Sequence, residues 1–186
     1  MSADIGIGNR RVLTGRLKDD TPVSVLELAP DDPKGSREWL RRQIEEGYEK
    51  LSPESRRLRF VSPPYHLPPW QLDYLSDLDP SHGAIWVARD ERFTEPVGMG
   101  LARCMRVDDD PGVAEVAFTV LDEYQNKGLG RMFMRVVIDH ARSNGIRQLR
   151  GYVLAENGPM LHLFESLGAL QPVEEGGLLR VDLPVV

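Results

Sequence analysis

The stretch from residue 114 to residue 131 constrains the fold of this chain more than any other. It begins with apolar and β-branched residues among which Glu115 is the one carboxylate, and neither proline nor glycine interrupts this run before Leu121. A polar turn follows and leads through Gly128 and Gly130 into a long amphipathic run. The pattern predicts a strand, a turn and a helix in direct succession. Because the first backbone N–H groups of a helix have no intrahelical partner, it also predicts an anion-binding site.

Hydrophobic periodicity and turn signals predict the other elements of the chain. Strands are predicted over residues 11–17, 23–28, 83–90, 96–107, 113–121, 147–154, 169–173 and 178–183. Helices are predicted after N-caps at Ser36 and Ser52, and over residues 70–78, 130–144 and 156–167. This order predicts an α+β, three-layer fold with helices on both faces of the sheet. We expect a single domain over residues 1–186, with a loose N-terminus at residues 1–8.

Composition excludes several classes of protein. The formal net charge of −6 argues against a nucleic-acid or anionic-membrane binder, since both normally carry a basic surface. A single cysteine, Cys104, excludes an internal disulfide and is expected to be a packed thiol. The four histidines have no paired metal-ligand spacing, so no metal is predicted. Without a signal peptide or a run of about 18 apolar residues, a cytoplasmic protein is expected.

Three arginines, Arg56, Arg57 and Arg59, follow the predicted N-cap at Ser52. Contact with phosphate is one interpretation of this run. The favoured interpretation is a solvated helix face whose aliphatic stems cover apolar surface. In an enzyme, a substrate-facing lid would lie in the roughly forty residues between the first and last of the helices that precede the central strands, because function concentrates on loops held by a scaffold.

The glycine turn is neither a P-loop nor a dinucleotide fingerprint, because Phe133 occupies the third glycine position of the latter. The motif Gln125-x-x-Gly128-x-Gly130, the strand before it, and the segment over residues 157–168 together resemble the GNAT superfamily of acetyl-CoA-dependent N-acyltransferases. The likeness extends to the branch of bacterial protein-lysine acetyltransferases. It implies a mixed, mostly antiparallel sheet that is splayed between its fourth and fifth strands, here residues 113–121 and 147–154.

The resemblance also implies the residues that bind acetyl-CoA. The backbone of two strand residues would bind the pantetheine arm, the amides of the turn would bind the pyrophosphate together with the Gln125 side chain, and Asn157 would bond the cofactor arm. An ordinary strand–loop–helix turn with glycines for packing is the alternative. The residues that the resemblance implies for binding acetyl-CoA are Phe118, Val120, Gln125, Lys127, Gly128, Leu129, Gly130, Arg131, Asn157 and Phe164.

Acyl transfer needs a neutral amine, whereas a lysine ammonium has a pKa of about 10.4, so a general base is useful. Glu115 lies where similar enzymes place this base; a cross-strand ion pair with Arg106 is the alternative. Phe164 stands where many of them carry a tyrosine general acid. The expected acceptor is a primary amine, either a small molecule or a protein lysine, and the expected state is a monomer or homodimer. The competing hypothesis is a GNAT-fold module that senses acyl-CoA without turnover.

Overall fold

The computed structural model describes residues 10–28, 33–77, 79–94 and 97–185, so the predicted loose N-terminus lies outside the described residues. An eight-stranded sheet has the order β1-β2-β3-β4-β5-β6-β8-β7. Its strands are β1 (Arg10–Arg16), β2 (Pro22–Glu27), β3 (Gly83–Asp90), β4 (Val97–Val107), β5 (Asp110–Val120), β6 (Gln148–Val153), β7 (Val173–Glu175) and β8 (Leu178–Pro184). The helices are α1 (Pro33–Lys50), α2 (Pro53–Phe60), α3 (Pro69–Leu75), the 3₁₀ turn η1 (Asp122–Tyr124), α4 (Leu129–Ser143) and α5 (Gly158–Glu165).

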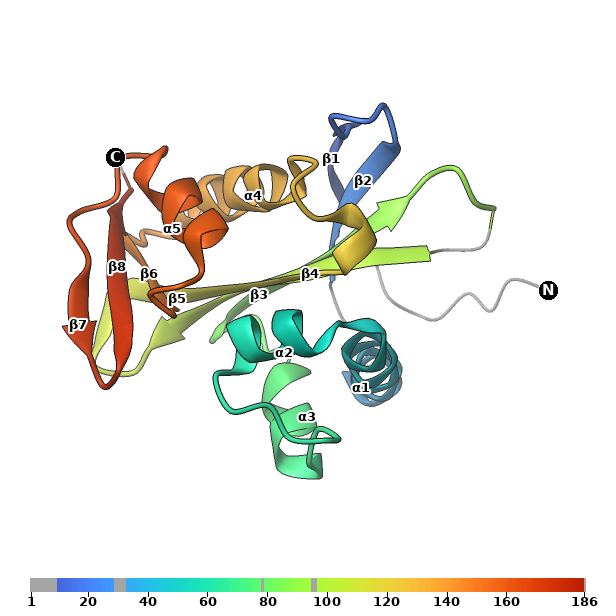
Figure 1. Ribbon diagram of the computed structural model, residues 1–186, viewed down its shortest axis with the longest axis horizontal. Helices are drawn as coiled ribbons and strands as arrows, with labels where there is room; N and C mark the ends of the chain where they lie inside the picture. Colours follow the sequence, from blue (N-terminus) through green and yellow to red (C-terminus); the bar gives the residue numbers. More distant parts are fainter. Residues whose placement is uncertain (1–9, 29–32, 78, 95–96, 186) are drawn as a thin grey trace.

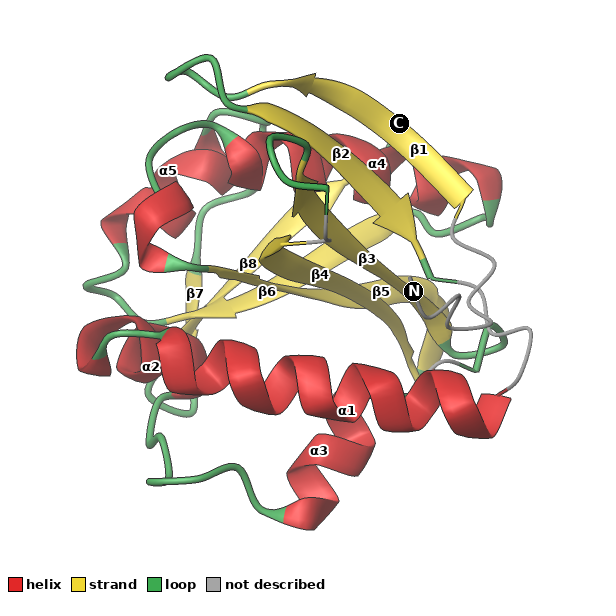
Figure 2. Cartoon of the chain, turned by 90° about the vertical axis from the view of Figure 1, so that its right-hand side faces the viewer, coloured by secondary structure: helices red, strands yellow, loops and turns green. Residues whose placement is uncertain are grey.

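Helices cover both faces of the sheet, as predicted. Figure 1 shows α4 and α5 on one side of the strands and α1, α2 and α3 on the other, and Figure 2 shows α1 running across its face. The principal core lies between the sheet and α4, where the rings of Phe118 and Phe133 stack with centroids 5.9 Å apart. Alternation along β5 therefore directs Phe118 toward α4 and its neighbours in sequence toward α1–α3.

The strands β5 and β6 are paired at their beginnings and then diverge. They pair in parallel over three residue pairs, Val113 with Gln148, Ala114 with Leu149 and Glu115 with Arg150. The other neighbouring strands pair antiparallel. This confirms the predicted splay between these two segments. They are the fifth and sixth strands in chain order because both strands of the N-terminal hairpin join the sheet.

Several element ends differ from the prediction. Helix α1 begins at Pro33 rather than after Ser36, because proline is favoured in the first turn of a helix. Helix α3 ends at Leu75, where the prediction continued to residue 78. The strand predicted from residue 169 begins only at Val173, after Pro172, whose missing N–H cannot join a ladder.

The side chain of Cys104 is fully buried, and burial raises the pKa of its thiol to about 12. A thiol that stays protonated is a poor nucleophile and a poor metal ligand. This confirms the prediction of a packed thiol.

His140 on α4 packs edge-on against Trp86, with ring centroids 5.1 Å apart. Burial lowers the pKa of His140 below its usual 6.5; the charge of Arg106 acts in the same direction and that of Glu27 opposes it. Above pH 6.5 the imidazole is neutral in both the folded and unfolded chains. Below pH 6.5 the His140 imidazole is protonated in the unfolded chain before it is protonated in the folded chain. The free energy of unfolding therefore falls as the pH drops toward the folded-state pKa of His140.

We therefore expect the contribution of His140 to the free energy of unfolding to fall as the pH is lowered from neutrality to about 5.5, the range in which histidines titrate. The pKa of His82, raised first by its hydrogen bond with Asp77, acts in the opposite direction. His140→Gln should lose less stability than the original chain over the same range, because glutamine does not titrate. Urea unfolding at each pH measures both proteins. Parallel curves for the two would show that His140 does not cause the loss.

Candidate acyl-transfer site

Glu115 lies at the last paired position before β5 and β6 separate. Its cross-strand neighbour on β4 is Met105, whereas Arg106 lies opposite Ala114 and therefore on the other face of the sheet. The alternative of an ion pair between Arg106 and Glu115 is thus wrong. The Arg106 guanidinium instead donates to the carbonyl oxygens of two residues at the ends of neighbouring elements, Pro111 and Asn144.

The other neighbour of Glu115, Arg150, binds Asp182 instead. Its Nε lies 2.8 Å from Oδ1 of Asp182, and this hydrogen bond raises the pKa of the guanidinium. Within the part of the chain that the structure describes, Glu115 itself has no hydrogen bond or ion pair. A half-buried carboxylate without a partner can accept a proton from a bound molecule.

Backbone groups of β5 face the splay. The amide of Leu121 donates to the carbonyl of Met99 on β4 at 3.0 Å. Because the bonding direction alternates along a strand, the N–H and C=O groups of Phe118 and Val120 point away from β4 and toward β6. The carbonyl of Val120 already accepts a hydrogen bond of 3.0 Å from Nε2 of Gln125. Phe118 therefore offers the freer pair of backbone groups.

The predicted phosphate contact of the Gln125 side chain needs correction. Nε2 also donates to Oγ of Ser55 at 2.9 Å, so the amide bridges α2 and the end of β5. Only Oε1 is left outside these contacts, and an oxygen acceptor is poorly suited to a phosphate. The geometry favours a structural role for this side chain.

The turn between β5 and α4 has a conformation suited to an anion. Asn126 and Gly128 have positive φ angles of 58° and 98°, and Gly128 caps α4 without any side-chain hydrogen bond. The amide of Arg131 is already occupied, because it donates to the carbonyl of Gly128 at 3.1 Å. The amides of Leu129 and Gly130 precede it in the first turn, where helix N–H groups lack intrahelical acceptors.

This turn is tied to the β1–β2 hairpin through Lys127. The Nζ atom of Lys127 lies 2.8 Å from Oδ2 of Asp19, and the Lys127 carbonyl accepts from the amide of Lys18 at 2.9 Å. The hydrogen bond from Lys127 is the main reason why the pKa of Asp19 falls to about 2. Lys127 therefore braces the turn with its side chain, and its predicted contribution to the site is its amide.

Helix α5 flanks the turn on its other side. A Cβ atom at Gly130 would lie 3.3 Å from Cδ2 of Leu163, and the Arg131 guanidinium donates to Oγ of Ser166 at 3.0 Å. Asn157 caps α5, with its Oδ1 accepting from the amide of Met160 at 3.2 Å. Capping uses the oxygen of Asn157 and leaves its NH₂ group as the donor for a ligand.

Phe164 is 1% exposed and points at the backbone of β6. An added Cβ at Gly151 would lie 2.6 Å from Cζ of the Phe164 ring, so the ring fills the space above this glycine. This placement favours a packing role for Phe164 over the predicted cofactor contact. Tyr124 and Tyr152 do not replace a general acid here: Tyr124 is buried with its hydroxyl on Asp90, and the Tyr152 hydroxyl donates to Glu175.

The sequence interpretation missed Asp122, which joins the turn to α2. Its carboxylate accepts hydrogen bonds from the amide and hydroxyl of Ser52, at 3.0 and 2.6 Å, and from the hydroxyl of Ser55 at 2.8 Å. Burial pulls the pKa of Asp122 upward, but these bonds outweigh it and leave the pKa below its usual range. No local pattern reveals this contact, because its partners are about 70 residues away.

Asp122→Ala should lower the free energy of unfolding by about 1–2 kcal/mol, because the capping interactions of α2 are lost. Urea unfolding at neutral pH measures the change. Glu123→Ala, at the neighbouring exposed carboxylate, should change stability by about 0.5 kcal/mol or less. Equal effects of the two substitutions would contradict an anchoring role for Asp122.

The arginine run is not a uniformly solvated face. Arg56 donates to the carbonyls of Tyr48 and Glu49, and Arg57 pairs with Glu54 and Glu156. Arg59 differs, because its Nε is buried and has no hydrogen-bond partner. Arg59 is therefore less solvated than the favoured interpretation assumed, although its side chain as a whole is half-buried.

No helix among the described residues is both long enough and apolar enough to cross a membrane. No group of three or more His, Cys, Asp or Glu side chains in that part of the chain is placed to hold a metal ion.

Comparisons with known proteins agree on the family. The model of the acetyltransferase (GNAT) family matches residues 37–169. An acetyltransferase of Pseudomonas aeruginosa is 32% identical over 152 residues, which cover 82% of this chain and 77% of that protein. Acetyltransferase Pat of Mycolicibacterium smegmatis is 35% identical over 117 residues, 62% of this chain and 34% of that protein, so the match spans about a third of it.

Solved structures show the same fold. The GNAT domain of S. lividans PAT superposes with a TM-score of 0.75 at 23% identity, covering 92% of this chain and 96% of that one. A cAMP-binding acyltransferase from Mycobacterium smegmatis gives a TM-score of 0.61 at 24% identity, covering 97% of this chain and 48% of that one. With a family match over most of its length and a splayed sheet of the expected kind, the chain belongs to the GNAT family of acetyltransferases and is an N-acetyltransferase.

Proposed function

We propose that this chain transfers the acetyl group of acetyl-CoA to a primary amine, a small molecule or a protein lysine, with Glu115 as the general base. The observation that carries the proposal is the position of Glu115. It is the last paired residue before β5 and β6 separate, and it forms no hydrogen bond or ion pair with any described residue. Its side chain lies on the sheet face covered by α1–α3, opposite the face that Phe118 shares with α4.

The residues around the splay suit acetyl-CoA. The uncapped start of α4, with Gly128 at positive φ, can offer amides to the pyrophosphate. The backbone of Phe118 can pair with a pantetheine amide as an added strand would. The NH₂ group of Asn157 can donate to the same arm. We assign the pyrophosphate chiefly to the amides of Gly128, Leu129 and Gly130.

Bound acetyl-CoA supplies an activated acyl carbon, which the neutral amine attacks. Glu115 accepts a proton from the ammonium form of the amine, directly or through one water molecule, and so supplies the neutral amine; the second proton of the amine passes to solvent as the new N–C bond forms. The C–S bond breaks and coenzyme A leaves as a thiol. Phe164 has no proton to donate, so the thiol proton comes from solvent.

Thiol release from acetyl-CoA across a panel of small amines and lysine peptides tests the proposal. We expect turnover with at least one acceptor and a nonenzymatic background without the protein. The competing function is an acyl-CoA sensor, and the absence of a tyrosine at Phe164 is the observation that favours it. Tight binding of acetyl-CoA with no thiol release on any acceptor would establish the sensor instead.

A further inference from the structure

Two arginines lie on the sheet face that carries Glu115. Arg103 on β4 pairs with Ala117, two residues along β5 from Glu115, so Arg103 and Glu115 are diagonal neighbours on one face. Such positions are about 7–8 Å apart between Cα atoms. Arg59 at the end of α2 belongs to the same cluster: burial and the charge of Arg103 lower its pKa to about 10, while Glu115 opposes the shift. We call Arg59 and Arg103 the arginine pair.

The arginine pair has unused hydrogen-bonding capacity. Buried, unpartnered Nε atoms occur in the described chain at Arg59, Arg89, Arg103 and Arg180. Arg89 and Arg180 each have a carboxylate within 4 Å. Arg59 and Arg103 form no ion pair with any described residue.

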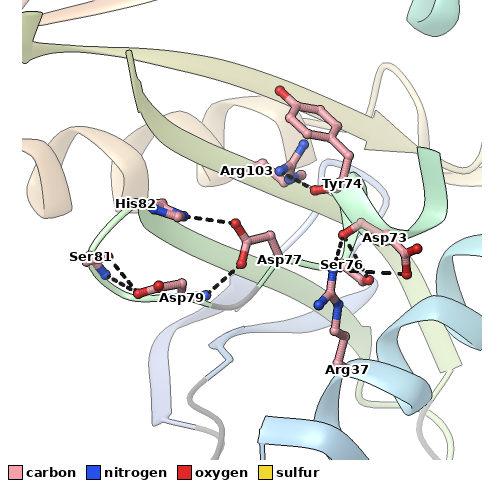
Figure 3. A network of polar contacts seen from close by, with 9 residues as sticks. All are labelled: Arg37, Asp73, Tyr74, Ser76, Asp77, Asp79, Ser81, His82 and Arg103. Carbon is pink, nitrogen blue, oxygen red and sulfur yellow. Dashed lines mark hydrogen bonds and ion pairs between the residues drawn. The ribbon is translucent and has the colours of Figure 1, made fainter. Parts of the chain in front are cut away.

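The contacts that the pair makes include no ion pair, and the charge of Glu115 offsets only part of the effect of burial on Arg59. Figure 3 shows Arg103 beside Tyr74: its NH2 atom donates to the Tyr74 carbonyl at 2.8 Å, and its guanidinium lies 4.6 Å from the ring centroid. Arg59 lies over the ring of Phe60 at 4.9 Å. Arg103 is only 4% exposed. Arg59 as a whole is half-buried. Placing two like charges close together where water is limited is costly unless an anion pairs with them.

We propose that Arg59 and Arg103 bind a carboxylate of the acyl acceptor, so that the acceptor is an amine carrying a carboxylate close to its amino group. This inference rests on the proposed function, because it requires the amine to approach Glu115. Guanidinium groups bind carboxylates through paired, charge-assisted hydrogen bonds. The carboxylate can belong to a small amino acid or to an acidic side chain beside a lysine; the chemistry at the arginine pair is the same.

Matched acceptors test the proposal and separate the two sources. The peptide arm compares a lysine peptide carrying glutamate beside the lysine with the same peptide carrying glutamine. The small-molecule arm compares 4-aminobutyrate with 4-aminobutanamide. In at least one arm the carboxylate member should have a kcat/KM about tenfold higher or more, which corresponds to one charge-assisted contact. The arm in which this occurs identifies the source.

Arg59→Gln should bring that ratio close to one, because KM rises for the carboxylate member, while binding of acetyl-CoA is unchanged. Arg56→Gln is the matched control on the same helix, since Arg56 donates to backbone carbonyls, and it should keep the preference. Turnover of amines with no preference for a carboxylate in either arm would overturn the inference and leave the proposed function intact. So would a preference that survives Arg59→Gln.

If no amine is turned over, the proposed function fails, and binding then decides the inference separately. The probes are the N-acetylated products of the same four compounds, titrated into the protein with coenzyme A present. Tighter binding of a carboxylate product by the original chain than by Arg59→Gln supports the arginine pair as a carboxylate site. Equal binding overturns it.

Discussion

Glu115→Gln should lower kcat/KM for amine acetylation by about 10²–10⁴-fold at neutral pH, the range typical of a lost general base. Glutamine has nearly the same shape but cannot accept the proton that the amine loses. The affinity for acetyl-CoA should not change, because the predicted cofactor contacts are made by the turn, by α5 and by the backbone of β5. Thiol release measures turnover, and titration calorimetry measures the affinity.

The loss of kcat/KM in Glu115→Gln should become smaller as the pH approaches the lysine pKa of about 10.4, since a larger fraction of the amine is then neutral without proton removal by Glu115. Asp109→Asn is a suitable control, because this exposed carboxylate lies in the turn that joins β4 to β5. It should retain full turnover. Equal turnover for Glu115→Gln and the original chain would remove Glu115 from the mechanism.

Phe164→Ala should destabilise the fold by about 3–5 kcal/mol, which is typical for a fully buried phenylalanine. The ring is 1% exposed and lies against the backbone at Gly151, so the space it leaves cannot be filled by a small local shift. Urea unfolding measures the loss. Gly151→Ala should also destabilise, by about 1–3 kcal/mol, because its Cβ would lie 2.6 Å from Cζ of the ring.

Phe164→Tyr tests whether the missing general acid can be restored. The added hydroxyl extends from Cζ, the ring atom closest to Gly151, so it would press on the β6 backbone. We expect a destabilisation of about 1–3 kcal/mol and no increase in kcat. A rise in kcat with stability retained would show that this position can hold a catalytic tyrosine after all.

The prediction for Glu115 and Arg106 shows how far strand register can be predicted from sequence. A simple turn placed these residues opposite one another, but β4 and β5 change register between Arg106 and Val107. Because side chains alternate with a period of two, a slip of one residue moves a side chain to the other face of the sheet. The residues of the turn do not reveal that Arg106 lies opposite Ala114, so the alternative of an ion pair with Glu115 could be excluded only from the structure.

Some features of the candidate site follow from the local sequence, and others depend on contacts with distant elements. The uncapped helix start at Gly128 follows from a short stretch of chain, because glycine tolerates a positive φ and helix amides are free at the N-terminus. The side-chain contacts of Gln125 and Lys127 do not follow from it. Both side chains turn to other elements, to Ser55 on α2 and to Asp19 in the first hairpin.

The sequence by itself determined the strand–turn–helix unit, the order of the elements, the family and the carboxylate at the splay, since each depends on residues close together in the chain. Only the tertiary structure decided that Arg59 joins Arg103 beside Glu115 and that Phe164 packs on Gly151. Such contacts join residues far apart in the chain. They depend on strand register and on the direction of each side chain, and neither is encoded in a local pattern.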